Sequence, residues 1–312
     1  MTNDLPSFPC YLSQSGHSEY TTIDQAKISV MDRGFIFGDG VYEVFVVYGG
    51  KPFRLDQHMA RLERSLAELR IPNPHTRAQW LEMVQKLIAP KVIAPSAEST
   101  GASVDIADIA SQDWLIYLQL SRGVALRDHV MPADIAPTVF MMRSPLKMPT
   151  DAQRAQGVAC VSADEFRWEK AHIKATSLLG AVLSRQISFD AGAVETVMFR
   201  DGFMSEAAAS NVWVVLDGVV IGTPKDNLVL EGIRYGLIEE ICAKQGIPYQ
   251  LRRVSRDEVF AADELMLSSA TKEVLPITQL DGKPVGHGQN KAKPGPVYQK
   301  LYAGYQAAKI AA

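Results

Sequence analysis

The sequence predicts a two-domain protein that combines the α/β and α+β classes. Its 312 residues, 47% of them hydrophobic, are enough for one large core or two ordinary ones. Strand-like and helix-like patterns alternate in both halves, and the polar stretch "SPLKMPTDAQRAQG" separates them. We therefore expect a smaller N-terminal α/β domain over 1–144, a linker over 145–157 and a larger C-terminal domain over 158–312.

The N-terminal half begins with a hairpin and a helix. In "VYEVFVVYGGKPFRL" (41–55), aromatic and β-branched residues flank a Gly-Gly turn, which is typical of a β-hairpin. A helix is expected in "LDQHMARLERSLAELRI" (55–71), with Asp56 as its cap and Arg61 at the flank of its apolar face. That face consists of Met59, Leu62, Leu66 and Leu69.

The remaining elements follow from the same patterns. A second helix is predicted over 76–91, a small-residue insertion over 91–112, and buried strands in "DWLIYLQLSRG" and "PTVFMMRSPL". The second half is expected to hold strands at 158–164, 194–200, 211–216 and 264–268, and helices near 176–190 and 233–245.

Composition excludes several classes of protein. The formal net charge of −3 provides no basic stripe for nucleic acid or an anionic membrane. No segment approaches eighteen consecutive apolar residues, and the N-terminus lacks the features of a signal peptide. Three scattered cysteines indicate neither a disulfide framework nor a zinc site. We expect a cytoplasmic protein.

One lysine stands where a polar run becomes apolar. In "EKAHIKATSLLGAVLSRQ" (169–186), Lys174 precedes a helix that Thr176 or Ser177 is expected to cap. The helix dipole and the apolar surroundings would both lower the pKa of Lys174, and a neutral amine can form a Schiff base with an aldehyde. An exposed surface lysine is the alternative.

Two segments are candidates for binding an anion. In "LVLEGIRYGLIEEICAKQG", a strand-like run ends at Gly232, and the first N–H groups of the following helix belong to Ile233 and Arg234. In "LMLSSATKEVLPI", Ser269 and Thr271 could add donors, although an ordinary turn explains the same residues. Arg61 could neutralise a dianionic phosphate.

A single carboxylate, Glu206, precedes small residues in "FMSEAAASNVW", which suggests that a flat or bulky group packs close by; an exposed turn acid is the alternative.

Two other motifs in the sequence favour different functions. Ser269 and Lys272 match the SxxK pattern of acyl-transferring serine enzymes, but no KTG-like partner follows. The glycines of "DRGFIFGDGVYE" lack dinucleotide spacing, and no pair of histidines is spaced for a metal.

Seven segments, taken in chain order, resemble the fold-type IV pyridoxal-phosphate aminotransferases. They lie between about residue 27 and about residue 285, and "RDH" favours the D-amino acid aminotransferase branch. The segments are "DRGFIFGDGVYEV", "HMARLERS", "LSRGVALRDH", "RWEKAHIKATSLLGAVLS", "SEAAASNVW", "LEGIR" and "SSATKEVLPI". The resemblance implies pyridoxal 5′-phosphate between the two domains and ping-pong exchange of an amino group between an amino acid and a 2-oxo acid.

The resemblance also implies roles for single residues. Lys174 matches the lysine, in the C-terminal domain, that holds the cofactor as an aldimine and moves the substrate proton. Glu206 matches the acid that pairs with the pyridine nitrogen. The residues that match the phosphate cup are Arg61, Ile233, Arg234, Ser269, Ala270 and Thr271.

Arg127 and His129, expected on one side of an extended segment, match the pair that traps the substrate carboxylate together with Tyr42. In this family the neighbouring subunit contributes that pair, so a homodimer is implied. The cationic pair favours D-amino acids, with pyruvate or 2-oxoglutarate as the partner class.

Two positions depart from the family pattern. Arg234 stands where a phosphate-binding threonine is common, and Ala270 where a hydroxyl residue is usual. Arg234 either compensates by charge or points toward substrate. Alternatives within the same fold are an (R)-amine transaminase, a branched-chain aminotransferase and an aminodeoxychorismate lyase; further away are an acyl-transfer enzyme and a catalytically silent binder.

Overall fold

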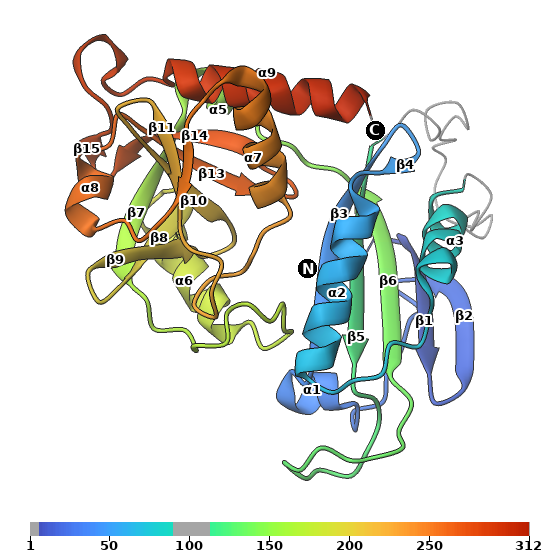
Figure 1. Ribbon diagram of the computed structural model, residues 1–312. Helices are drawn as coiled ribbons and strands as arrows, with labels where there is room; N and C mark the ends of the chain where they lie inside the picture. The colour runs from blue at the N-terminus through green and yellow to red at the C-terminus, as the bar shows by residue number, and fades with distance from the viewer. Residues whose placement is uncertain (1–5, 90–112, 312) are drawn as a thin grey trace. The chain divides into compact units, whose positions relative to one another are not determined.

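The computed structural model describes residues 6–89 and 113–311, which form two compact units (Figure 1). Unit 1 contains the described residues up to Leu146 together with Ile173–Ser177. Unit 2 contains Lys147–His172 and the described residues from Leu178 onward. The expected insertion at 91–112 lies outside the described residues.

Unit 1 is built on a six-stranded sheet in the order β2-β1-β6-β5-β3-β4. All its pairings are antiparallel, and β3 and β4 form the predicted hairpin across Gly49 and Gly50. The strands are β1 (Pro9–Gln14), β2 (His17–Thr22), β3 (Gly40–Tyr48), β4 (Lys51–Pro52), β5 (Trp114–Ser121) and β6 (Thr138–Pro145).

Three helices belong to this unit: α1 (Arg33–Phe37), α2 (Leu55–Glu68) and α3 (Arg77–Ile88). Apolar side chains of α2 and α3 share one core with the sheet. Thr76 begins α3 with a capping box, in which its side chain and that of Gln79 each accept a hydrogen bond from the other residue's backbone N–H. The expectation that Asp56 caps α2 was wrong, because the N-cap is Arg54, two residues earlier, and Asp56 lies in the first turn of the helix.

The segment Ile173–Ser177 packs with unit 1, whereas the sequence had been interpreted with Lys174 in the C-terminal domain. Ala175 forms an isolated β-bridge with Val41, and the Thr176 N–H donates to the Gly40 carbonyl. These backbone bonds account for its position. The predicted domain boundaries stay a prediction, and the stretch proposed as a linker contains a short capped helix.

Unit 2 is built on a mixed nine-stranded sheet in the order β12-β11-β10-β13-β14-β7-β8-β9, with β15 paired to β14. Since β9 also contacts β10, the sheet curls around an apolar core. Its strands are β7 (Val158–Asp164), β8 (Glu195–Arg200), β9 (Phe203–Ala207), β10 (Asn211–Leu216), β11 (Val219–Gly222), β12 (Tyr249–Leu251), β13 (Glu264–Ser269), β14 (Glu273–Leu280) and β15 (Lys283–Pro284).

The C-terminal helix runs beside α7 and contacts β13 and β14, as Figure 1 shows in red. The helical elements of unit 2 are α5 (Asp151–Gln156), α6 (Leu179–Asp190), α7 (Arg234–Gln245), α8 (Arg256–Phe260), η1 (Gly288–Asn290) and α9 (Pro296–Ile310). No helix among the described residues is long and apolar enough to cross a membrane. The predicted combination of the α/β and α+β classes is confirmed, and the structure adds that it is built on two separate sheets.

Candidate active site

The residues predicted to form the site divide between the two units, and each set is described by itself. The set in unit 1 consists of Tyr42, Arg61, Arg127, His129 and Lys174. The set in unit 2 consists of Glu206, Ile233, Arg234, Ser269, Ala270 and Thr271.

Lys174 lies against β3. The Tyr42 N–H donates to the Lys174 carbonyl at 2.9 Å, and the Lys174 N–H donates to the Ser65 hydroxyl at 3.2 Å. These bonds direct its ammonium to the face of the Tyr42 ring, with Nζ 4.0 Å from the ring centroid. Tyr42 in turn stacks on Tyr117, and burial raises the pKa of Tyr117 to about 12, so this phenol stays neutral at physiological pH. The backbone and the aromatic ring together fix the direction of the amine.

The expected capping of the next helix was wrong. α6 begins at Leu179, and its N-cap, Leu178, makes no side-chain capping bond. The hydroxyls of Thr176 and Ser177 both donate to the Gly38 carbonyl instead, each at 2.9 Å. Gly38 has a φ of 65°, which favours glycine. The two hydroxyls therefore hold the lysine segment in unit 1.

Arg61 lies in a buried ion pair. Its Nε and one terminal nitrogen bind the two oxygens of Glu43 at 2.7 and 2.8 Å, and His58 Nδ1 lies 2.8 Å from the same carboxylate. Burial alone would raise the pKa of Glu43, but Arg61 and His58 hold it well below its usual range. Glu43 therefore stays ionised and offsets part of the charge that Arg61 was predicted to present to a phosphate.

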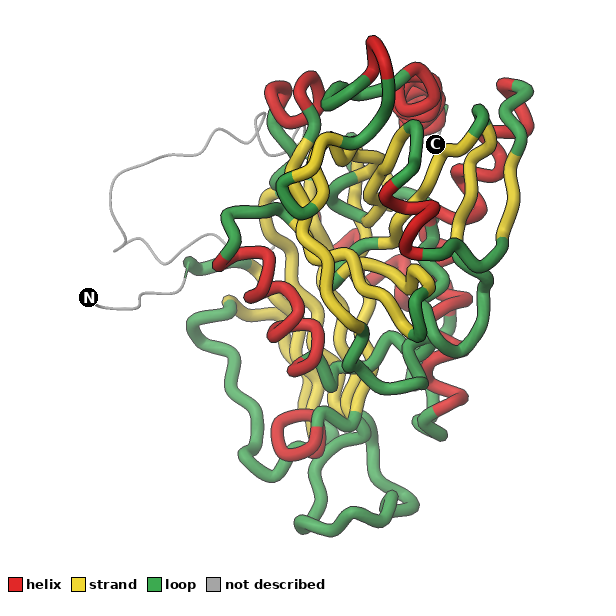
Figure 2. The backbone as a smooth tube through the Cα atoms, turned by 90° about the vertical axis from the view of Figure 1, so that its left-hand side faces the viewer, coloured by secondary structure: helices red, strands yellow, loops and turns green. Residues whose placement is uncertain are grey.

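Arg127 and His129 lie in the long connection between β5 and β6, which is loop throughout (Figure 2). The expected extended segment is instead a series of bends, but both side chains reach one ring. The Arg127 guanidinium lies 5.5 Å and the His129 ring 5.4 Å from the centroid of Phe37. Arg33 fixes the loop by donating to the Asp128 carbonyl at 2.6 Å. The exposed pair therefore shares one side of the loop.

Glu206 is a buried acid on β9 and is 7% exposed. Its Oε2 accepts hydrogen bonds from the Asn211 side chain at 3.3 Å and from the Leu230 N–H at 3.1 Å. Gly232 lies close by, where a Cβ would collide with the Asn211 amide oxygen. The alternative reading of Glu206 as an exposed turn acid is excluded.

A second cation, which the sequence did not predict, lies at this carboxylate. Arg167 lies 3.2 Å from Glu206 Oε1 and also pairs with Glu165. Burial works to lower the pKa of Arg167, but Glu165 and Glu206 outweigh it and raise that pKa. The pairing joins residues 39 positions apart, so only the polar "RWEK" run hinted at it.

The segment that precedes α7 is not the strand that was expected. Residues 223–232 form a loop, and Ile233 is the N-cap of the helix. Arg234, 2% exposed, donates to the Ala270 carbonyl at 3.3 Å, which joins the start of α7 to the turn between β13 and β14. We call this turn, Ser269–Lys272, the cup turn.

The cup turn does not support the acyl-transfer alternative. Lys272 directs its ammonium at the buried Glu195, 3.0 Å away. The Ser269 hydroxyl accepts a hydrogen bond from the Lys272 backbone N–H at 3.1 Å. If a lysine is to act as the base for a serine nucleophile, its amine must lie within hydrogen-bond distance of the serine hydroxyl. This lysine serves as an ion-pair partner instead.

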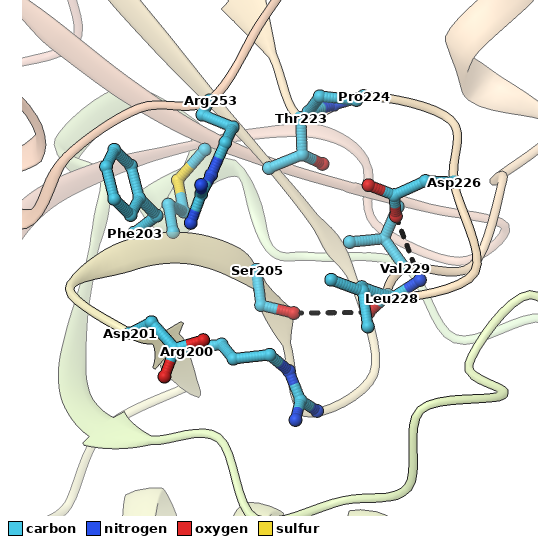
Figure 3. Close-up of a pocket in the computed structure, with 11 residues that line it drawn as sticks. Arg200, Asp201, Phe203, Ser205, Thr223, Pro224, Asp226, Leu228, Val229 and Arg253 are labelled. Carbon is cyan, nitrogen blue, oxygen red and sulfur yellow. Dashed lines mark hydrogen bonds between the residues drawn. The ribbon is translucent and has the colours of Figure 1, made fainter.

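Unit 2 also contains a small pocket that is lined in part by the loop at 223–232 (Figure 3). The Ser205 hydroxyl makes a long hydrogen bond of 3.4 Å to the Leu228 carbonyl, and the Leu228 N–H donates to Asp226 at 2.8 Å. Arg253 stacks over Phe203, 3.7 Å from the ring centroid. The polar groups of this pocket thus help to hold the loop whose Leu230 N–H reaches Glu206.

The chain is thus an α/β protein of two compact units, each built on one sheet. Unit 1 carries the segment with Lys174, and unit 2 carries the buried acid Glu206. A family model described as amino-transferase class IV matches residues 40–280. The chain belongs to this family: it is an aminotransferase, and its cofactor is pyridoxal 5′-phosphate.

Similar proteins extend over most of the chain. The D-alanine aminotransferase of Bacillus licheniformis is 34% identical over 282 residues, 90% of this chain and 92% of that protein. That of Staphylococcus aureus (strain COL) is 32% identical over 93% of this chain and 95% of that protein. The branched-chain aminotransferase of Thermoproteus uzoniensis matches in structure with a TM-score of 0.80 at 22% identity, over 98% of this chain and 96% of that one, which shows a shared fold.

The residues present fit the cofactor chemically. The aldehyde needs an amine, which Lys174 can provide; the ring nitrogen needs a carboxylate, which Glu206 can provide in a buried, hydrogen-bonded form. The phosphate needs donors and positive charge, which the cup turn and the buried Arg234 beside it can supply. Ala270 contributes no hydroxyl.

Proposed function

We propose that this aminotransferase exchanges the amino group of a D-amino acid with the keto group of a 2-oxo acid of the pyruvate or 2-oxoglutarate class. The D-alanine aminotransferases that are 34% and 32% identical to the chain support this substrate class. The observation that carries the proposal is the position of Arg127 and His129 around the Phe37 ring, where two cationic-type side chains share one side of an exposed loop. The solved branched-chain enzymes support the fold alone.

Each residue receives one task in this proposal. Lys174 Nζ binds the cofactor aldehyde and moves the proton of the substrate Cα. Glu206 keeps the ring nitrogen protonated, and Arg61, Ile233, Arg234, Ser269, Ala270 and Thr271 surround the phosphate. Bound pyridoxal 5′-phosphate supplies the electron sink that the reaction needs. Tyr42, Arg127 and His129 bind the substrate carboxylate.

The proposal includes a cytoplasmic location, which rests on the sequence alone, and a homodimer, for which the structure offers support. The support is α6, whose buried face carries Ser184 and Ser188, both 0% exposed, whereas Leu179 is 72% and Val182 60% exposed. This is the reverse of an ordinary surface helix, and apolar faces left exposed on one chain mark contacts with another. Sedimentation of the purified protein at micromolar concentration tests it, and a monomer would contradict it.

Replacing Arg127 by alanine is expected to raise KM for D-alanine about ten-fold or more, because a charge-assisted bond to the carboxylate is lost. The absorbance of the bound cofactor should not change. Steady-state kinetics with D-alanine and with a carboxylate-free (R)-amine measure the effect, and the amine should be converted at the parent rate.

Two further variants control this test. Arg127→Lys keeps the charge and should restore part of the affinity, whereas Lys27→Ala removes an exposed cation elsewhere in unit 1 and should change nothing. Equal losses with both substrates in Arg127→Ala would show that this loop does not bind the carboxylate, and Arg234 would become the leading candidate.

A further inference from the structure

The first residue after the cup turn, Glu273, is a buried carboxylate at which two helices meet. It is 1% exposed and begins β14 with a φ of 59°. Arg154 of α5 binds its Oε2 at 2.9 Å. From α9, Gln306 donates to Oε2 at 2.9 Å and Lys309 to Oε1 at 2.8 Å. We call these three donors the brace.

The backbone at Glu273 needs this support. A left-handed φ is unfavourable for a residue with a Cβ, and it persists only where the surroundings fix it. Three hydrogen bonds to one buried carboxylate provide that restraint, because each donor carries charge or an amide and comes from a helix outside the hairpin. The brace therefore sets the geometry with which the chain leaves the cup turn.

Two further contacts hold the cup turn itself, one at Lys272, the residue before Glu273, and one at Ala270. Lys272 pairs with Glu195, which is 0% exposed and also accepts from the Ser210 hydroxyl at 2.9 Å. Arg234 holds the Ala270 carbonyl. These two contacts hold Lys272 and Ala270. The direction of the N–H groups in the cup turn then depends on where the brace holds Glu273.

We propose that Glu273 is a positioning residue for the cofactor phosphate, and that α9, which follows the region matched by the family model, controls phosphate binding through Gln306 and Lys309. This rests on the proposed role of the cup turn. The brace touches no cofactor atom in this scheme; it acts through the backbone of residues 269–272. The C-terminal helix thereby becomes part of the determinants of cofactor retention.

The test uses the full-length protein with Gln306→Leu and Lys309→Met combined. Arg154 remains as a partner, so the carboxylate is not left buried alone. The dissociation constant of pyridoxal 5′-phosphate should rise about ten-fold, as expected for the loss of a hydrogen bond to a charged group. The ³¹P resonance of the bound cofactor should shift, while binding of pyridoxal, which lacks the phosphate, should stay at the parent value.

Controls separate this role from simple stabilisation. Lys300→Met changes an exposed lysine on the same helix and should leave both dissociation constants as in the parent. A double variant that melts earlier as apoprotein but keeps the parent affinity and ³¹P shift would overturn the proposal. Equal weakening of both ligands would overturn it too, because the effect would then not concern the phosphate.

The parent protein separates this inference from the function on which it rests. A parent that binds pyridoxal 5′-phosphate no better than pyridoxal would remove the role of the cup turn, and the brace proposal with it. If the parent prefers pyridoxal 5′-phosphate to pyridoxal and the double variant keeps that full preference, the role of the brace is refuted and the role of the cup turn stands. The single variant Glu273→Gln should reproduce the loss of preference if the double variant fails to fold.

Discussion

Replacing Lys174 by alanine is expected to abolish transamination, because its side chain is the amine that we propose for the cofactor aldehyde. The backbone of Lys174 is held by Tyr42 and Ser65, and its ammonium lies over the Tyr42 ring. Alanine keeps those backbone bonds, so the fold should be retained while the nucleophile is lost. Amino-group exchange between D-alanine and 2-oxoglutarate measures the activity.

A second readout reports on the covalent link itself. Sodium borohydride should bleach the visible absorbance of the parent and fix the cofactor to the protein, and it should fix none to Lys174→Ala. Lys170→Ala removes an exposed lysine four residues earlier in the chain and should behave as the parent. Substantial turnover in Lys174→Ala, or cofactor fixed elsewhere in it, would refute the assignment.

The second large effect is expected from Glu206→Gln, which should lower kcat by about two orders of magnitude or more while the cofactor stays bound. A neutral amide keeps the shape of the side chain but cannot hold a proton on the ring nitrogen by charge. Arg167, which pairs with Glu206, would then place its positive charge near that nitrogen without an opposing carboxylate from β9. Single-turnover kinetics with D-alanine measure the loss in the chemical step.

The matched control is Glu231→Gln, which neutralises a half-exposed glutamate paired with Lys225. Its turnover should stay within about two-fold of the parent, as is usual for surface substitutions. An unchanged rate in Glu206→Gln would place this acid away from the ring nitrogen. Loss of bound cofactor with an unchanged rate in the remaining holoenzyme would give it a binding role only.

The sequence by itself determined the elements that local pattern encodes. The Gly49-Gly50 turn after a β-branched and aromatic run specifies the β3 and β4 hairpin, and the spacing of Met59, Leu62 and Leu66 specifies the buried face of α2. The seven segments in order were sufficient for the family, which the class IV model confirms. These features depend on neighbours within a few residues, so they can be predicted from the chain.

Tertiary structure alone decided which charges meet. Arg61 was predicted to lie at the flank of α2, but the fold buries it against Glu43. Only the polar "RWEK" run pointed toward the pairing of Arg167 with Glu206, and nothing near Lys309 pointed toward Glu273. A buried charge is costly without a partner, so folding brings one from wherever the topology allows, and no periodicity in the sequence records that choice.

The start of α6 was decided in the same way. Thr176 and Ser177 are ordinary capping residues by type, yet their hydroxyls bind the Gly38 carbonyl, because the lysine segment pairs with β3 before the helix begins. Local propensity sets what these side chains can do. The tertiary contact settles which bond forms: the lysine segment lies against Gly38 and Gly40, so the two hydroxyls donate to a carbonyl there, whereas a cap would require their oxygens to accept from the first N–H groups of the helix.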